Sequence, residues 1–119
     1  MLSSPQIVIV FYQESDSTCP VVEFLLGQPA RVQQDAQARI KLLAERGYML
    51  RRPYCDNLGE GLWELRWHTG HVQYRILYCF HGRQSAVLIH ALTKEGTIPV
   101  ADLNRAQRRL QRFTQNPAA

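Results

Sequence analysis

Side chains able to bind phosphate and transfer protons recur in three apolar segments of this sequence. Glu64 and Arg66 lie two residues apart in LWELRWH, and Arg75 lies in the next segment, VQYRILYCFH. His90 and Lys94 come at the end of the third segment. Guanidinium and ammonium groups bind phosphate, and a carboxylate or an imidazole can move protons near neutral pH. These residue types together predict a site that binds a phosphate group and transfers protons.

Three antiparallel strands are expected to position these side chains. Apolar and polar residues alternate over 62–68, 72–81 and 85–92, which is typical of strands. Thr69-Gly70 and Gly82-Arg83 then predict two tight hairpin turns. On the middle strand the expected core face carries the four residues Tyr74, Ile76, Tyr78 and Phe80.

The predicted register places the polar side chains in one row on the opposite face. With two-residue turns, Arg75 lies between Glu64 and His90, Arg66 is diagonal to Arg75, and Lys94 follows the strand end. This face has few apolar residues, so we expect it to stay uncovered. A simpler interpretation remains open: a Glu64–Arg75 surface salt bridge worth about 0–1 kcal/mol, beside an ordinary strand histidine.

The remaining elements complete an α+β fold in one domain, residues 1–119. β-Branched and aromatic residues predict a strand at 6–12, at the edge of the sheet. Pro20 and Pro29 suit the first turns of two helices, which end at Gly27 and Gly47. Residues 48–60 are expected to form a loop. Thr97 and Pro99 precede a last helix, so the order is β-α-α-β-β-β-α.

Composition narrows the class of protein. The chain of 119 residues has a net charge of +4 and 45% hydrophobic residues, which is typical of a globular domain. Residues 1–50 hold four Lys/Arg against five Asp/Glu, whereas residues 51–119 hold ten against five. The positive half favours a polyanionic partner. Three widely spaced cysteines argue against disulfides, and the absence of a long apolar run or signal peptide predicts a cytoplasmic protein.

Three motifs resemble the RelE/ParE toxin superfamily, in particular its phage-derived, HigB-type branch. Residues 58–66, LGEGLWELR, are similar to the branch's L-x-x-G-L-[WY]-E-L-R segment. Residues 74–78, YRILY, are similar to its Y-R-[IV]-[LF]-Y segment, and residues 89–94, IHALTK, precede Pro99 as in the family. The resemblance covers about Ala30 to Gln115, and the three motifs occur in the family's order.

The resemblance implies the toxin of a type II toxin–antitoxin system, with a RelE-like fold. Such toxins cut messenger RNA on the ribosome without a metal, by attack of the 2′-hydroxyl on the adjacent phosphorus. In the family, basic residues of these motifs contact the phosphate and the transition state. The resemblance assigns this role to Arg75, Arg66 and Lys94. Glu64 and His90 are proton-transfer candidates, which the resemblance supports only loosely.

The resemblance also implies partners: the ribosome, messenger RNA, and an antitoxin, expected to be a helix-turn-helix protein from an adjacent gene. No cofactor, metal or membrane partner is expected. Exposed arginines could extend the RNA- or ribosome-binding surface; those of the last helix could instead bind an acidic antitoxin segment or face solvent. They are Arg51, Arg52, Arg105, Arg108, Arg109 and Arg112.

A non-enzymatic protein with the same fold is the alternative, either a gyrase inhibitor or an inactive phage-derived adaptor. Two departures from the family pattern bear on the acid–base assignment and on whether the chain is an active nuclease. Glu95 stands where many relatives have a second lysine after Lys94, and residues 95–119 contain no tyrosine.

Overall fold

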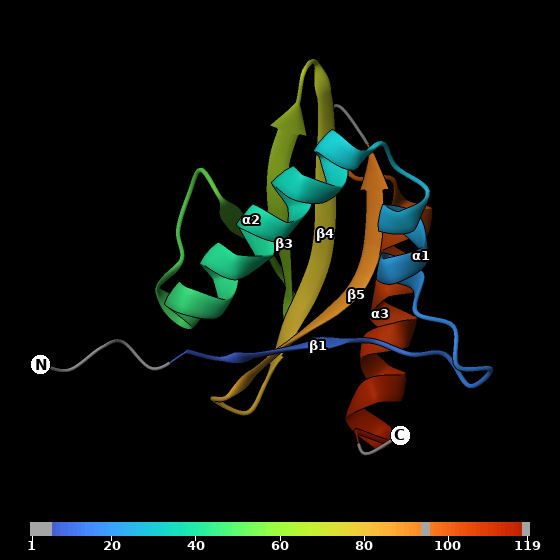
Figure 1. Ribbon diagram of the computed structural model, residues 1–119. Coiled ribbons are helices and arrows are strands. Elements are labelled where there is room, and N and C mark those ends of the chain that lie inside the picture. The colour runs from blue at the N-terminus through green and yellow to red at the C-terminus, as the bar shows by residue number, and fades with distance from the viewer. Residues whose placement is uncertain (1–5, 94–95, 118–119) are drawn as a thin grey trace, which may run out of the picture.

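The computed structural model describes residues 6–93 and 96–117. Five strands in this part of the chain form one sheet in the order β1-β5-β4-β3-β2 (Figure 1). β2 to β5 pair antiparallel, and the edge strand β1 runs parallel to β5. The strands are β1 (Val8–Phe11), β2 (Cys55–Gly59), β3 (Leu62–Thr69), β4 (Val72–His81) and β5 (Ser85–Thr93). The predictions of an α+β fold and of an N-terminal edge strand are confirmed.

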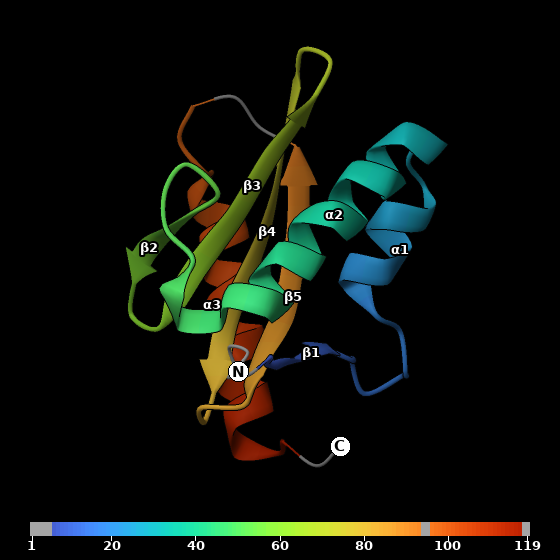
Figure 2. The ribbon, with the colours of Figure 1, turned by 60° about the vertical axis from the view of Figure 1, so that its left-hand side comes forward.

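Helices cover both faces of the sheet. α1 (Pro20–Leu26) and α2 (Ala30–Arg46) lie on one face, and α3 (Val100–Gln115) lies on the other (Figure 2). A short 3₁₀ turn, η1 (Gly47–Met49), follows α2. Each α-helix begins at or directly after a proline, which suits a position where the backbone N–H has no helical partner. No helix among the described residues is long and apolar enough to cross a bilayer.

The prediction of a loop over residues 48–60 is wrong in its second half, where β2 lies. Its sequence, CDNLG, is rich in residues that favour turns, so local propensity opposes a strand. Pairing with β3 supplies the missing stabilisation, because Cys55 is opposite Leu65 and Asn57 is opposite Trp63. The observed order therefore has four consecutive strands before α3 instead of three.

The turn between β3 and β4 differs from the predicted turn by one residue. Thr69 pairs with Val72, so the turn residues are Gly70 and His71. Gly70 has a φ of 60°, and a glycine at the first turn position gives a hairpin turn that matches the strand twist. The predicted Thr69-Gly70 turn would have put a β-branched residue at that position. The change moves the register by two residues, so every side chain keeps its face.

The pairing of β4 with β5 also differs from the prediction. His81 pairs with Ser85, which leaves a three-residue turn instead of Gly82-Arg83. A bulge then separates the pairs Tyr78–Leu88 and Leu77–His90, so Ile89 has no partner on β4. As a result His90 is opposite Leu77, and the predicted Arg75–His90 pair does not form.

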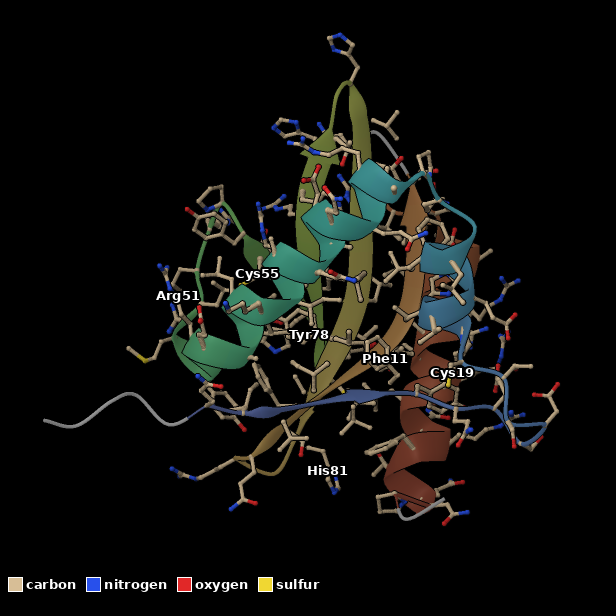
Figure 3. The ribbon with its side chains drawn as sticks, in the orientation of Figure 1. Phe11, Cys19, Arg51, Cys55, Tyr78 and His81 are labelled. Carbon is tan, nitrogen blue, oxygen red and sulfur yellow. The ribbon has the colours of Figure 1, made fainter. Side chains whose placement is uncertain are left out.

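The expectation of an uncovered polar face is wrong, because α3 packs on that face and creates a second core. The first core lies between the sheet and α1 and α2, and it contains Tyr78 (Figure 3). The second includes Leu77, Ile89 and Ala106. Leu62, Leu77 and Cys79 supply the apolar surface that α3 needs, so the two faces of the sheet each bury a helix layer.

Candidate functional site

Arg66 and Arg75 are directly opposite each other on neighbouring strands. Both project from the face of the sheet that α3 covers, because each alternates with residues of the first core, such as Leu65 and Ile76. Opposed side chains have Cβ atoms about 5 Å apart, and like charges in this position destabilise a sheet. The fold tolerates the two guanidinium groups because carboxylates lie beside them.

Two carboxylates link the arginines into one chain of alternating charge. Glu64 Oε1 lies 3.2 Å from Arg75 Nε, and Glu64 Oε2 lies 4.0 Å from Arg66 Nη1. Asp56 Oδ2 lies 3.6 Å from Arg66 Nη2 and 3.0 Å from Arg52 Nη2. Hydrogen bonds from Arg52 hold the pKa of Asp56 below its usual value, so this carboxylate stays ionised at neutral pH. The chain has three cations and two anions, and one phosphodiester would make it neutral.

Asp56 is a site residue that the sequence did not reveal. It lies on β2, in the segment expected to be a loop, and it is opposite Glu64 in the sheet. The signal that could have found it is the alternation of Asp56 with Cys55 and Asn57 once the segment is treated as a strand.

The Glu64–Arg75 pair is buried. The exposed fractions are 5% for Glu64 and 7% for Arg75. Arg75 Nη1 also donates a hydrogen bond of 2.6 Å to the carbonyl of Gly96, in the segment that connects β5 to α3. The contact between Nε and Oε1 is an ion pair without a directed hydrogen bond, so both atoms keep unused hydrogen-bonding capacity. A buried ion pair with unsatisfied hydrogen-bonding groups lowers the stability of the fold. Such groups in a native protein therefore suggest a functional role.

A hollow of about 250 Å³ opens at this pair, between β2, β3, β4 and the start of α3. Glu64, Arg66 and Arg75 form its polar part. The rest of its lining consists of Leu58, Gly96, Thr97, Ile98 and Leu103. Because the Arg66 side chain is 32% exposed, its guanidinium is the one most accessible to a ligand. The hollow therefore offers two guanidinium groups, one carboxylate and an apolar wall to an anionic molecule.

His90 lies outside this hollow and in a second polar network. Its Nε2 is 2.7 Å from Asp102 Oδ1, and its Nδ1 is 2.9 Å from Arg109 Nη1, so both ring nitrogens have partners on α3. Burial lowers the pKa of His90, and the positive charges of Arg109 and Arg105 add to this, whereas Asp102 opposes it. The contacts of His90 with Asp102 and Arg109 therefore link β5 to α3. Lys94 lies outside the described residues.

The lowered pKa of His90 predicts a loss of stability in acid. The folded protein binds a proton at His90 less readily than the unfolded chain, so this contribution is present above pH 6.5 and is lost as the pH falls below it. Urea unfolding between pH 7.5 and 5 should show a smaller decrease in the His90→Gln variant. The difference is at most about 1.4 kcal/mol per pH unit. Identical pH dependence in both proteins would contradict a buried neutral His90.

The other predicted basic residues divide between two places. Arg51 donates to the carbonyl of Leu50 at 2.9 Å, and Arg52 binds Asp56 near the hollow. The arginines of α3 lie toward β1, at the other edge of the sheet, where Arg109 and Arg112 bind Glu14. Among the described residues, no group of three or more His, Cys, Asp or Glu side chains could hold a metal ion.

The fold and the hollow define an α+β protein with two paired arginines in a hollow between a sheet and its last helix. The family model "Phage derived protein Gp49-like (DUF891)" matches residues 23–111. The chain belongs to this family, which is related to the RelE/HigB toxins. The matched segment contains every residue that lines the hollow. No curated protein matches the chain at a significant level.

Proposed function

We propose that this protein is a toxin that cuts messenger RNA, with the scissile phosphodiester bound in the hollow at Arg66 and Arg75. One observation carries the proposal: two guanidinium groups oppose each other across β3 and β4, beside a carboxylate, in a hollow between the sheet and α3. A phosphate group accepts hydrogen bonds from two guanidinium forks and removes the like-charge repulsion between them.

The chemistry that fits this arrangement is internal transfer of the phosphoryl group. The RNA 2′-oxygen forms a bond to phosphorus while the bond from phosphorus to the 5′-oxygen breaks. The 2′-hydroxyl loses its proton to a base, and the leaving oxygen gains one from an acid. Arg66 and Arg75 stabilise the added negative charge of the transition state, as does Lys94 in the family pattern. The products are a cyclic phosphate and a 5′-hydroxyl.

Glu64 is the proton acceptor that this proposal assigns. Its carboxylate lies within 4.0 Å of both arginines, so it is close to any phosphate that they bind. His90 was the other candidate from the sequence, but its ring nitrogens are bound to Asp102 and Arg109. We therefore propose that His90 holds α3 against β5, which keeps the helix side of the hollow in place.

The proposed biological setting follows from the family. A RelE-like toxin acts on messenger RNA in the ribosome, and an antitoxin from an adjacent gene neutralises it. The antiparallel sheet with a parallel N-terminal edge strand and a C-terminal helix supports this fold assignment. The excess of positive charge in residues 51–119 supports an RNA partner.

The type of RNA end distinguishes this mechanism from others. Purified protein should cut messenger RNA in programmed ribosomes and leave 5′-hydroxyl ends, which polynucleotide kinase labels without prior phosphatase treatment. The upstream fragments should carry a cyclic phosphate. Ends bearing a 5′-phosphate would contradict attack by the 2′-hydroxyl, and absence of cutting with and without ribosomes would contradict the nuclease assignment.

A non-enzymatic binder with the same fold is the second candidate. The observation in its favour is that Arg75 is already bound to Glu64 and to the Gly96 carbonyl, as in a structural ion pair. Growth arrest without cut RNA, together with retention of gyrase on the immobilised protein, would support this candidate.

A further inference from the structure

A second polar hollow lies on the other side of α3, toward the β1 edge of the sheet. Its volume is about 210 Å³, and its lining consists of Glu14, Arg105, Arg108, Arg109 and Arg112. We call the hollow lined by these five residues the α3 arginine groove. Four guanidinium groups therefore surround one carboxylate. The groove is separate from the Arg66–Arg75 hollow, which opens toward β2 at the opposite edge of the sheet.

Glu14 shows how this groove binds a carboxylate. Its Oε2 accepts a hydrogen bond of 3.1 Å from Arg109 Nε, and its Oε1 accepts one of 3.2 Å from Arg112 Nη1. The hydroxyl of Tyr12, a buried residue, donates a third hydrogen bond of 3.0 Å to Oε1. Arg109 is itself held by the carbonyl of Ile89. The guanidinium groups are thus oriented for carboxylate binding.

Half of the groove has capacity for another anion. Arg105 and Arg108 have no hydrogen-bond or ion-pair partner among residues 6–93 and 96–117, and both are exposed. They lie one turn before Arg109 and Arg112 on the same helix. With Glu14 as the one acidic lining residue, the groove has an excess of three positive charges. Such an excess attracts acidic partners.

An adjoining hollow adds an apolar component. It has a volume of about 300 Å³ and shares Glu14 and Arg112 with the groove. The rest of its lining is mixed: Val10, Phe11 and Phe113 are apolar, whereas Gln13, Ser15, Ser17 and Asn116 are polar. A surface that joins a partly apolar hollow to basic side chains fits a protein segment with apolar and acidic residues close together. A sugar–phosphate backbone would leave the apolar side chains of this hollow without contacts.

We propose that the α3 arginine groove is a docking site for an acidic segment of a partner protein. Carboxylates of the segment bind Arg105 and Arg108, and an apolar side chain of the same segment enters the hollow beside Phe113. Glu14 and Arg112 lie outside residues 23–111, the part matched by the family model. The site therefore combines family residues with residues from the two ends of this chain, and it does not depend on the proposed nuclease activity.

A defined peptide tests this proposal. The probe is a fluorescein-labelled peptide of Glu-Leu repeated five times, and binding to the full chain is measured by fluorescence anisotropy. The Arg105→Gln/Arg108→Gln double variant should bind it about ten-fold more weakly, because two charge-assisted hydrogen bonds are lost. The corresponding Gln-Leu peptide should bind the wild-type protein about as weakly as the Glu-Leu peptide binds the double variant. The Arg31→Gln variant is the matched control, since Arg31 is an exposed helical arginine of α2.

Three results would overturn the proposal. Equal affinity for the Glu-Leu and Gln-Leu peptides would remove the role of the carboxylates. Equal affinity of the double variant and wild type would place binding elsewhere. Tighter binding of oligouridylate of the same length, lost in the double variant, would make the groove an RNA-binding surface. Circular dichroism of each variant checks its fold, and Arg105 and Arg108 are exposed, so their replacement leaves the core unchanged.

Discussion

Cleavage of RNA should fall by about 10²–10³-fold when Arg75 is replaced by alanine, which is the usual loss when one preorganised transition-state donor is removed. Arg75 is oriented by Glu64 and the Gly96 carbonyl, so its guanidinium needs no reorganisation as charge develops on the phosphate. The measurement is the single-turnover rate on programmed ribosomes, together with growth after induced expression. Equal toxicity of both proteins would show that Arg75 is not at the reacting phosphate.

A second variant separates catalysis from folding, because loss of the buried Arg75 also affects stability. Arg66 is more exposed and lines the same hollow, so Arg66→Ala should slow cleavage with little change in the melting temperature. Arg31→Ala on α2 should leave both properties unchanged, since this residue pairs only with Asp35 among the described residues. An active Arg66→Ala variant would contradict the paired-arginine site even if Arg75→Ala failed to fold.

Replacement of Glu64 by alanine should lower the free energy of unfolding by about 3–5 kcal/mol. The reason is that Arg75, 7% exposed, would keep its charge in the interior without the carboxylate. Urea unfolding of the wild type and the variant at neutral pH gives the difference. A change of less than about 1 kcal/mol, which is typical of an exposed pair, would contradict a buried ion pair.

The double variant Glu64→Gln/Arg75→Met separates the contribution of the ion pair to stability from its contribution to RNA cleavage. Replacing both members of a buried pair by neutral side chains often restores stability, so we expect most of the lost free energy to return while RNA cleavage stays absent. The single variant Glu64→Gln should also cut RNA much more slowly than the wild type if Glu64 accepts the 2′-proton. Cleavage by the Glu64→Gln variant at the wild-type rate would show that Glu64 does not accept the 2′-proton.

The burial of this pair bears on both proposed functions. An exposed Glu64–Arg75 bridge would have agreed with the simpler interpretation of the sequence, a surface contact of little energy. The structure instead gives an interior ion pair that borders a hollow, with a backbone carbonyl as an additional partner for Arg75. Such a pair contributes little net stability because both charges are desolvated, and its position beside a hollow favours a ligand-binding role.

The sequence predicted the kinds of element and the faces of the strands. Alternation over β3 and β4 placed Glu64, Arg66 and Arg75 on one side, and the structure agrees because a register error of two residues leaves every face unchanged. The helices also agree within a few residues, since prolines and glycines act locally at their ends. These features depend on backbone preferences within a few neighbouring residues.

The pairing partners of the strands and the burial of the polar side chains depended on the tertiary structure. β2 exists because β3 offers it hydrogen bonds, and the Ile89 bulge, which shifts His90 toward α3, arises from pairing over the whole length of β4. The cover of the polar face by α3 likewise brings together residues far apart in the chain. The spacing of residues in one segment carries no information about which distant segment will pack on it.

Local periodicity by itself thus determined that two arginines and a glutamate share one face of an antiparallel sheet in a basic half of the chain. Only the tertiary structure decided that Arg66 opposes Arg75, that Asp56 joins them, and that Glu64 is buried on the face that α3 covers. The physical reason is that a strand's alternation follows from its own backbone geometry, whereas register and burial follow from the free energy of contacts between distant segments.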